Sequence, residues 1–348
     1  MKTIEKLQIP SKAQSLIEWR DDLKQDVADL ENIFFENNTL TLRTKAEFCS
    51  KAELIIMGET LTTAQLNTLL SLLSSQGVAS TMLFSPEVIA DVVTMRFLLS
   101  DYPDVLKSQL ELFAKQATVD FALMEKFPDW SKPGLVLMDM DSTTIQIECI
   151  DEIARLYGVG EQVSAVTALA MQGKLDFNES LRTRVSKLEN MPISILKEVA
   201  DNMPLMPGLT SLIAGLKQAG WKVAIASGGF NYFAERLQKD HGFDFTIANT
   251  LEIENDYLTG TVTGEIVNAD VKARTLKELA EQYSIPMSQT VAIGDGANDL
   301  VMMDASAMGI AIHAKPIVQE KAAISLNNLD LQGALAILSA HKNASWKK

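Results

Sequence analysis

The sequence is poor in the residues that build disulfide frameworks and transition-metal sites. It has only two cysteines, Cys49 and Cys149, and three histidines among 348 residues. Two isolated cysteines form neither a disulfide framework nor a metal-binding spacing, which suits a reducing compartment. Cys149 lies in an apolar, helix-like stretch, so we expect it to be an inert part of the core.

Positive charge and long apolar runs are also scarce. The formal net charge is −14, which argues against nucleic acid or an anionic membrane as the main partner, because both bind basic surfaces. No apolar run approaches membrane-spanning length, and the opening segment "MKTIEKLQIPSK" lacks the apolar region of a secretion signal. We therefore expect a soluble cytoplasmic protein. The negative net charge is still compatible with a small anionic substrate, because a metal ion or local basic residues can make the electrostatic potential positive at one site.

The N-terminal region, residues 1–127, has the pattern of an α+β domain. After an irregular start it gives a strand at "AELIIMGETL", a helix at "TAQLNTLLSLLSSQ", strands around "STMLF" and "VTMRFLLS", a helix at "PDVLKSQLELFAKQ" and a strand at "VDFALMEK". This β-α-β-β-α-β order is ferredoxin-like, and no cluster of catalytic residue types occurs in it. The segment "PDWSKPG", within residues 128–134, breaks the pattern and is expected to be a linker.

From residue 135 to residue 348, short apolar runs alternate with amphipathic helices. The runs are "LVLM", "KVAIAS", "FTIAN", "TVAIGD" and "GIAIHA". Apolar residues at successive positions are typical of parallel strands buried on both faces. The pattern predicts an open, Rossmann-like parallel α/β sheet, and in such sheets the chemistry lies at the carboxyl ends of the strands.

Two insertions interrupt this sheet. Residues from about 149 to 205 have a nearly continuous helical pattern, and Asp176 with Glu179 three residues later predicts a capped helix start. A helical insertion directly after a catalytic strand is well placed to act as a lid. The segment "TLEIENDYLTGTVTGEIV" predicts a β-hairpin that turns near Thr259–Gly260.

Polar residues follow three of the apolar runs, and a lysine lies on the helical stretch before the run "TVAIGD". These residues are Asp139 and Asp141 in "DMDST", Ser227 and Gly228 in "SGGF", Asp295, Asn298 and Asp299 in "GDGAND", and Lys272. Clustered carboxylates raise one another's pKa unless a cation neutralises them, and a hard divalent ion such as Mg²⁺ is the simplest neutraliser. A serine hydroxyl, glycine N–H groups and a lysine are usual partners of a phosphate. One aspartate can attack phosphorus while another, two residues on, handles the proton.

Other motifs fit less well. The spacing Asp139-x-Asp141-x-Thr143 starts like an EF-hand loop, but Thr144 stands where that loop needs glycine and Ile150 where it needs glutamate. "GDGAND" lacks the third glycine of the dinucleotide fingerprint, and no GxxxxGK[ST] motif occurs. A receiver-like signalling module, phosphorylated on an aspartate beside Mg²⁺, is a rival, although receivers lack both the second aspartate and a large cap.

The motifs "DMDST", "SGGF", Lys272 and "GDGAND", in this order, resemble the four motifs of the haloacid dehalogenase (HAD) superfamily. The segments "IDEIARLYGV", "MQGKLDFNESLRTRVS" and "HAKPIVQEKA" resemble the phosphoserine phosphatase family within it, and the resemblance covers about Leu135 to Leu338. It implies a HAD fold with a helical cap and a Mg²⁺-dependent phosphoric monoester hydrolase. The implied reaction converts O-phospho-L-serine to L-serine, the last step of its biosynthesis. A related phosphotransferase or a broader phosphomonoesterase is the alternative.

The resemblance also implies roles for the reacting and metal-binding residues. Asp139 would be the nucleophile, forming an aspartyl-phosphate, and Asp141 would be the general acid and base. Asp139, the backbone carbonyl of Asp141 and Asp295 would bind Mg²⁺, with Asp299 behind them.

The substrate-binding residues implied in the same way fall into two sets. Those that would bind the phosphate side are Ser227, the Gly228 N–H, Lys272 and Asn298. Those that would bind or enclose the serine are Glu148, Arg184, Met171 and Phe177.

Helix geometry independently supports Arg184. At about 100° per residue, Arg184 returns to within about 20° of the direction of Phe177, whereas Arg182 points about 140° away. If Phe177 faces the pocket, Arg184 does too, and Arg182 is expected on the surface. Taken without the resemblance, Arg184 and Glu148 could equally be surface residues.

The β-α-β-β-α-β pattern of residues 1–127 resembles the ACT-like domains that often accompany amino-acid enzymes. This likeness implies a regulatory or dimerising module, and hence a homodimer formed through the N-terminal domain.

Overall fold

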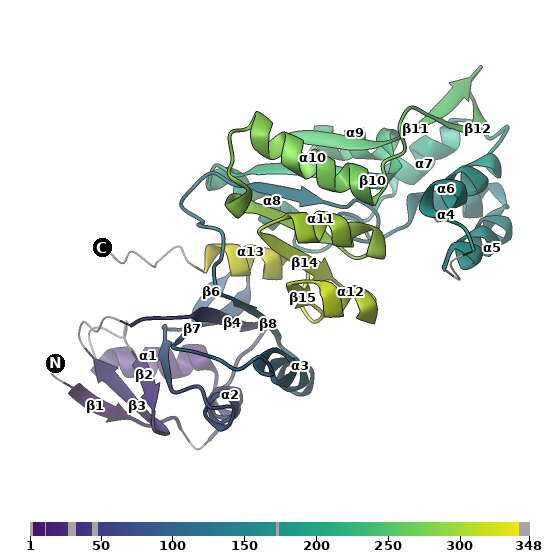
Figure 1. Cartoon of the computed structure of the whole chain (residues 1–348). Coiled ribbons are helices and arrows are strands. Elements are labelled where there is room, and N and C mark those ends of the chain that lie inside the picture. Colours follow the sequence, from purple (N-terminus) through teal and green to yellow (C-terminus); the bar gives the residue numbers. More distant parts are fainter. Residues whose placement is uncertain (1–2, 11, 27–32, 44–47, 172–173, 341–348) are drawn as a thin grey trace. The chain divides into compact units, whose positions relative to one another are not determined.

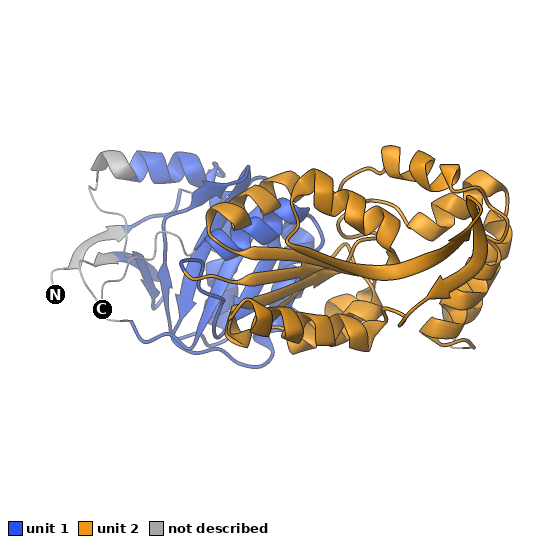
Figure 2. Ribbon diagram, turned by 90° about the horizontal axis from the view of Figure 1, so that it is seen from above, with its two compact units in different colours: residues 1–131, 323–348 blue, residues 132–322 orange. Residues whose placement is uncertain are grey.

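The computed structural model describes residues 3–10, 12–26, 33–43, 48–171 and 174–340. The chain divides into two compact units, residues 1–131 with 323–348, here called unit 1, and residues 132–322, here called unit 2 (Figure 2). The division lies within the predicted linker, residues 128–134. Unit 2 is shorter than the predicted phosphatase domain, residues 135–348, because residues 323–348 belong to unit 1.

Unit 1 is built on an antiparallel sheet with the strand order β1-β3-β2-β5-β7-β4-β8-β15 (Figure 1). Its strands are β1 (Thr3–Leu7), β2 (Ile33–Glu36), β3 (Thr39–Arg43), β4 (Ala52–Gly58), β5 (Ser80–Leu83), β6 (Glu87–Ile89), β7 (Val92–Leu99), β8 (Asp120–Met124) and β15 (Ile324–Leu326). Its helices are α1 (Leu16–Asp26), α2 (Thr63–Ser75), α3 (Leu106–Ala117) and α13 (Leu331–Ser339).

The order β4-α2-β5-β7-α3-β8 follows the predicted β-α-β-β-α-β pattern, with the short strand β6 added beside β7. The expectation of an irregular start was wrong, because β1, α1, β2 and β3 precede this pattern. The β2–β3 hairpin turns at Asn37 and Asn38, whose φ angles of 48° and 56° are left-handed. Asparagine tolerates this region better than most residues, so these two residues allow the tight turn.

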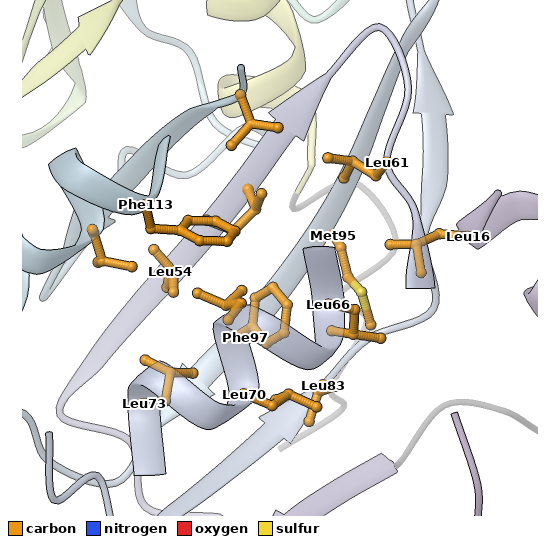
Figure 3. Close-up of a cluster of buried hydrophobic side chains, with 14 of the residues drawn as sticks. Leu16, Leu54, Leu61, Leu66, Leu70, Leu73, Leu83, Met95, Phe97 and Phe113 are labelled. Carbon is orange, nitrogen blue, oxygen red and sulfur yellow. The ribbon is translucent and has the colours of Figure 1, made fainter. Parts of the chain in front are cut away.

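The core of unit 1 lies between the sheet and its helices. Figure 3 shows Leu66, Leu70 and Leu73 of α2 beside Phe97 of β7 and Phe113 of α3, all of which are buried. These leucines recur at helical spacing on one face of α2, so the helix buries an apolar stripe on the sheet.

The C-terminal segment joins unit 1 through backbone and side-chain contacts. Ser325 of β15 pairs antiparallel with Phe121 of β8, and α13 packs on β4 and β7. The buried carboxylate of Asp120 accepts hydrogen bonds from the backbone N–H groups of residues 327–329 at 2.8–3.2 Å. These contacts explain why residues after 323 belong with unit 1.

Unit 2 contains the predicted parallel sheet. Its strands, in spatial order, are β14 (Met308–Ile312), β13 (Thr290–Gly294), β9 (Leu135–Met138), β10 (Lys222–Phe230), β11 (Phe245–Glu254) and β12 (Tyr257–Thr263). The first five are parallel neighbours, and β12 is antiparallel to β11. All five predicted apolar runs are therefore strands. The chain winds outward from β9 to β11 and then returns to β13, so the winding reverses beside β9. This is the switch point at which open α/β sheets bind ligands.

Helices cover both faces of this sheet (Figure 1). They are α8 (Leu209–Gln218), α9 (Asn231–His241), α10 (Ala269–Gln282), α11 (Leu300–Ala305) and α12 (Pro316–Lys321), with 3-10 turns η1 (Met287–Gln289) and η2 (Ala297–Asp299). Leu276 of α10 and Met302 of α11 share a buried cluster with Leu137 of β9. Helices α8 and α9 pack against β10, and β9 is buried at every position. The uniformly apolar runs are explained by this two-sided burial.

In the described part of the predicted cap there are four helices: α4 (Cys149–Tyr157), α5 (Gly160–Met171), α6 (Phe177–Ser186) and α7 (Ser194–Asp201). Helix α6 begins as predicted, with the Asp176 carboxylate accepting from the Glu179 N–H at 2.8 Å and the Glu179 carboxylate accepting from the Asp176 N–H at 3.3 Å. This reciprocal capping box fixes the start of the helix that carries Arg184.

The β11–β12 hairpin exists, but its predicted turn was wrong. The turn lies at Asn255–Asp256, with φ angles of 50° and 65°, rather than at Thr259–Gly260. Two residues with positive φ make the tight turn that matches strand twist, and asparagine and aspartate tolerate that conformation. Strand β12 also holds the cap, because Leu258 exchanges backbone hydrogen bonds with Asn190 and Met191 at 2.8 Å each.

Candidate active site

Three carboxylates meet at the switch point of the parallel sheet. Asp139 directly follows β9, Asp295 directly follows β13, and Asp299 ends the turn η2. Each offers an oxygen within 4.8 Å of the oxygens of the other two. The Asp139 N–H donates to the carbonyl of Ile293 at 2.9 Å, so the parallel pairing of β9 with β13 brings the two strand ends together.

Lys272, in the first turn of α10, is fully buried beside this cluster. Its Nζ lies 2.8 Å from Asp139 Oδ1 and 2.7 Å from Asp299 Oδ1. Burial acts to lower the pKa of this lysine, but the charges of Asp139 and Asp299 outweigh burial and raise it. Lys272 therefore keeps its positive charge beside the aspartate that was predicted to be the nucleophile.

The cluster holds more negative charge than Lys272 neutralises. Burial raises the pKa of Asp295 to about 7, and the charges of Asp139 and Asp299 add to the effect. Burial also raises the pKa of Asp299, and Asp139 adds to it, although Lys272 acts in the opposite direction. A buried set of hard oxygen ligands with excess negative charge fits a divalent metal ion. The residues present thus suit the predicted metal site, whereas the backbone carbonyl of Asp141 as a ligand stays a prediction.

Asp141 lies next to the cluster in a different environment. Its Oδ2 accepts from the Cys149 N–H at 3.3 Å, and its buried Oδ1 has no hydrogen-bond partner among the described residues. Burial raises the pKa of this carboxyl well above its usual range, and the charges of Glu148 and Asp139 raise it further. Asp141 is therefore a carboxyl that readily holds a proton. Burial also raises the pKa of the Cys149 thiol, which keeps the thiol protonated and supports its predicted inert character.

The segment Ser227-Gly228-Gly229 approaches the same site from β10. Ser227 is buried, and its Oγ accepts from the Gly229 N–H at 2.9 Å. A Cβ on Gly228 would lie 2.7 Å from the ring of Phe177, and one on Gly229 would lie 2.6 Å from Met140 Cε. A side chain at Gly228 would press on the Phe177 ring, and one at Gly229 would have to displace Met140, so glycine lets the backbone come close to the cap and to Asp141.

Two groups of polar residues escaped prediction. The buried amide of Asn249 donates to the carbonyls of Gly228 and Gly229 and accepts from the Val267 N–H. Thr143 donates to Asp295 Oδ1 at 3.2 Å, and the Thr144 hydroxyl donates to the carbonyl of Asp139. The same pattern that selected the aspartates could have found Asn249, because it is the polar end of the run "FTIAN".

The cap and the sheet enclose a cleft of about 660 Å³. Phe177 and Arg184 of α6 line it from the cap, and Asn298 of η2 lines it from the sheet side. Arg184 is half-buried and Arg182 is exposed, so the predicted orientation of the two arginines is confirmed. Met171 ends α5, but its side chain lies outside the described residues.

Carboxylates lie near Arg184, but among the described residues none of them forms a direct ion pair with it. Arg184 Nε is buried and has no hydrogen-bond partner among the described residues. Burial lowers the pKa of Arg184, and the charges of Asp151 and Glu148 oppose that shift. Glu148 accepts from the Ser142 hydroxyl at 2.8 Å. An unpaired cation with carboxylates nearby suits a ligand that carries both a carboxylate and an ammonium group.

The fold and the carboxylate site together agree with one class of protein. A family model described as haloacid dehalogenase-like hydrolase matches residues 133–306, half of the chain. The chain therefore belongs to the haloacid dehalogenase-like hydrolases. Among the described residues, no helix has the length and apolar character needed to cross a membrane.

Curated and solved relatives narrow this class. A phosphoserine phosphatase from Vibrio cholerae is 52% identical over 246 residues, which cover 70% of this chain and 75% of the relative. The unliganded crystal structure of a probable phosphoserine phosphatase from Vibrio cholerae is 45% identical, covers 87% of this chain and 91% of its own, and gives a TM-score of 0.74. The structure of a phospho-aspartyl intermediate analogue of phosphoserine phosphatase is 40% identical, covers 59% of this chain and 99% of its own, and gives a TM-score of 0.56. Within the superfamily, the chain is a member of the phosphoserine phosphatase family.

Proposed function

We propose that this enzyme hydrolyses O-phospho-L-serine to L-serine and phosphate in a Mg²⁺-dependent reaction, as the last step of L-serine biosynthesis in the cytoplasm. The observation that carries the proposal is the cluster of Asp139, Asp295 and Asp299 at the switch point, with Lys272 paired to two of them and a glycine loop beside them. The names of the relatives support the substrate, and the phospho-aspartyl analogue of one solved relative supports a covalent intermediate.

The proposed chemistry uses two aspartates in turn. An oxygen of Asp139 attacks phosphorus and forms the aspartyl-phosphate, while Asp141 gives a proton to the departing serine oxygen. Asp141 then takes a proton from a water molecule, whose oxygen attacks the same phosphorus and releases phosphate and the Asp139 carboxylate. Lys272, charged and 2.8 Å from Asp139, stabilises the developing negative charge. Mg²⁺, held by Asp139, Asp295 and the Asp141 carbonyl, would offset the charge of the carboxylates and polarise the phosphoryl oxygens.

The proposed substrate contacts divide between the phosphate and the serine part of the substrate. Ser227, the Gly228 N–H and Asn298 bind the phosphate side. Arg184 binds the substrate carboxylate and Glu148 binds its ammonium group. Phe177 and Met171 enclose the serine, so the closed cap excludes bulk water from the aspartyl-phosphate.

We also propose that unit 1 pairs two chains or regulates the enzyme. Its likeness to ACT-like domains in the order of its elements supports this role. Removing residues 1–131 would be an unsuitable test, because β15 and α13 would lose the strands on which they pack. Light scattering of the full chain, with and without serine, is the better measurement. A monomer with no response to serine in size or activity would refute the proposal.

Phosphate release from a panel of substrates tests the enzymatic proposal. We expect Mg²⁺-dependent release from phosphoserine to exceed that from phosphothreonine, phosphohomoserine and a sugar phosphate, and to stop with a chelator. Similar rates on all four substrates would instead favour a broader phosphomonoesterase. Transfer of phosphate to an added hydroxy amino acid would favour a phosphotransferase.

A further inference from the structure

Asn249 is a buried polar residue to which the chemistry proposed above gives no role. It is 2% exposed and lies on β11, where that strand passes the glycine loop of β10. Its side chain makes three hydrogen bonds, with Nδ2 donating to the carbonyls of Gly228 at 2.8 Å and Gly229 at 3.2 Å, and Oδ1 accepting from the Val267 N–H at 2.9 Å. A side chain satisfied in this way on two different segments holds them at a fixed separation.

The register of β10 and β11 explains why such a residue is needed. The two strands pair in parallel up to Ala226 and Ile247, and pairing resumes at Phe230 and Asn249. Three residues of β10, 227–229, therefore lie opposite one residue of β11. The carbonyls in this bulge lie outside the regular strand pairing, and the half-buried carbonyls of Gly228 and Gly229 need other donors. The Asn249 amide supplies a donor to both glycine carbonyls, so the bulge keeps one conformation.

The acceptor side of Asn249 reaches the segment that carries Lys272. Val267 precedes Asn268, the N-cap of α10, whose side chain accepts from the Val271 N–H at 3.1 Å. The Lys272 N–H donates to the carbonyl of Asn268 at 3.0 Å, so Lys272 lies in the first turn that follows. Through one amide, Asn249 thus ties the glycine loop to the start of the helix that places Lys272.

We propose that Asn249 is a positioning residue for the phosphate group: it holds the Gly228 N–H and the Lys272 ammonium at the separation that one phosphate bridges. This inference rests on the proposed function and adds a residue to it. The three contacts need two donors and one acceptor, and a side-chain amide supplies this set, whereas a hydroxyl has only one donor. An aspartate of the same shape would lose the donor and place a negative charge against two carbonyl oxygens.

Binding of inorganic phosphate to the full chain with Mg²⁺, measured by calorimetry, tests the proposal. We expect Asn249→Asp to raise the Kd for phosphate roughly tenfold or more, since its hydrogen bonds to two carbonyls of the glycine loop are lost. Asn249→Ala, which adds no charge, should act in the same direction and serves if Asn249→Asp does not fold.

Asp244→Asn is the matched control. Asp244 precedes the other end of β11, where its carboxylate accepts from the Val223 N–H at 2.9 Å, far along the strand from the glycine loop. We expect it to lower thermal stability while leaving the Kd for phosphate unchanged. Unchanged phosphate binding in both Asn249 variants, with stability losses like that of Asp244→Asn, would reduce Asn249 to a structural role and overturn the proposal.

Comparing two substrates tests the proposed role of Asn249 independently of which phosphate ester the enzyme uses. Asn249→Asp should reduce kcat/KM for phosphoserine and for p-nitrophenyl phosphate by the same factor, because the two share only the phosphate. A loss confined to phosphoserine would contradict phosphate positioning. If the natural chain binds phosphate but does not hydrolyse phosphoserine, the proposed function fails and the phosphate measurement still decides the role of Asn249. If the natural chain binds no phosphate, both proposals fail.

Discussion

Both units bury charged side chains, but they compensate the charges differently. In unit 1, Asp120 accepts from the backbone N–H groups of residues 327–329, and Glu53 pairs with Arg96. In unit 2, by contrast, Lys272 pairs with Asp139 and Asp299, and Asp295 adds a third carboxylate to their cluster. Burial of a carboxylate therefore does not by itself mark an active site. What distinguishes the site is a group of neighbouring carboxylates that has too few protein partners to neutralise it. Only a ligand or a metal ion can supply the missing positive charge.

The largest expected effect comes from removing the nucleophile in unit 2. Asp139→Asn should reduce phosphate release by at least about 10³-fold, as loss of a covalent nucleophile does in other enzymes. Its thermal midpoint in chelator should not fall, because a like charge leaves a crowded cluster. Calorimetry and a phosphate assay check the two parts. Near-normal turnover would remove Asp139 from the reaction, and a large loss of stability would mean that the cluster is structural, like Asp120.

In unit 1 we expect the opposite result, a loss of stability without a loss of activity. Asp120→Ala removes the acceptor of the N–H groups of residues 327–329, of which only that of Leu329 is buried. We expect the free energy of unfolding to fall by roughly 1–3 kcal/mol, the cost of one buried group left unpaired. Activity per folded molecule should be unchanged. Urea denaturation is the measurement, with the exposed Asp101→Ala as the control of small effect. A folded Asp120→Ala protein without activity would break the proposed contrast between the units.

A smaller and selective effect is expected at the serine end of the cleft. Arg184→Ala should lower kcat/KM for phosphoserine by about 10–100-fold, equivalent to the roughly 1.5–3 kcal/mol of a hydrogen bond to a charged group. Hydrolysis of p-nitrophenyl phosphate, which has no carboxylate, should hardly change. Arg182→Ala, on the exposed face of the same helix, should leave both substrates unaffected. Equal losses on both substrates in Arg184→Ala would indicate a structural arginine.

The smallest expected effect is a pH dependence of stability in unit 2 without metal. The pKa of Asp295 is raised to about 7 in the folded protein, so its protonated form favours folding. That contribution is complete below the ordinary carboxyl pKa and is lost as pH rises through about 7. In chelator, the thermal midpoint should therefore fall by a few degrees between about pH 5 and about pH 8, and Mg²⁺ should reduce the fall. A midpoint that rises with pH in chelator would contradict the charge excess.

The sequence predicted the parts that depend on local pattern. Strands buried on both faces have uninterrupted apolar runs, and the polar residues after those runs, Asp139 and Asp295, lie together because parallel strands share an edge. The inward orientation of Arg184 followed from helix geometry. These features need only the neighbouring residues and the regularity of the elements.

The parts that were missed depend on pairing between distant segments. The hairpin turns at Asn255–Asp256, between the paired residues Glu254 and Tyr257, whereas the prediction placed the turn at the glycine of Thr259–Gly260. Asn249 has a role only because β10 bulges opposite it. The short strand β15 pairs with β8 of unit 1 although the whole of unit 2 lies between the two strands in the sequence, so no local pattern predicts this pairing.

The central claim is that the uncompensated cluster makes Asp139 a nucleophile that carries phosphate. Asp141→Asn should slow the breakdown of the phosphoenzyme, because no carboxylate remains to take the proton of the attacking water. Rapid quenching of this variant with phosphoserine and Mg²⁺, followed by mass spectrometry of its peptides, measures this directly. The account predicts a phosphoryl group on Asp139 that persists in Asp141→Asn and is transient in the natural chain. Normal turnover in Asp141→Asn, or phosphate found on any residue other than Asp139, would contradict it.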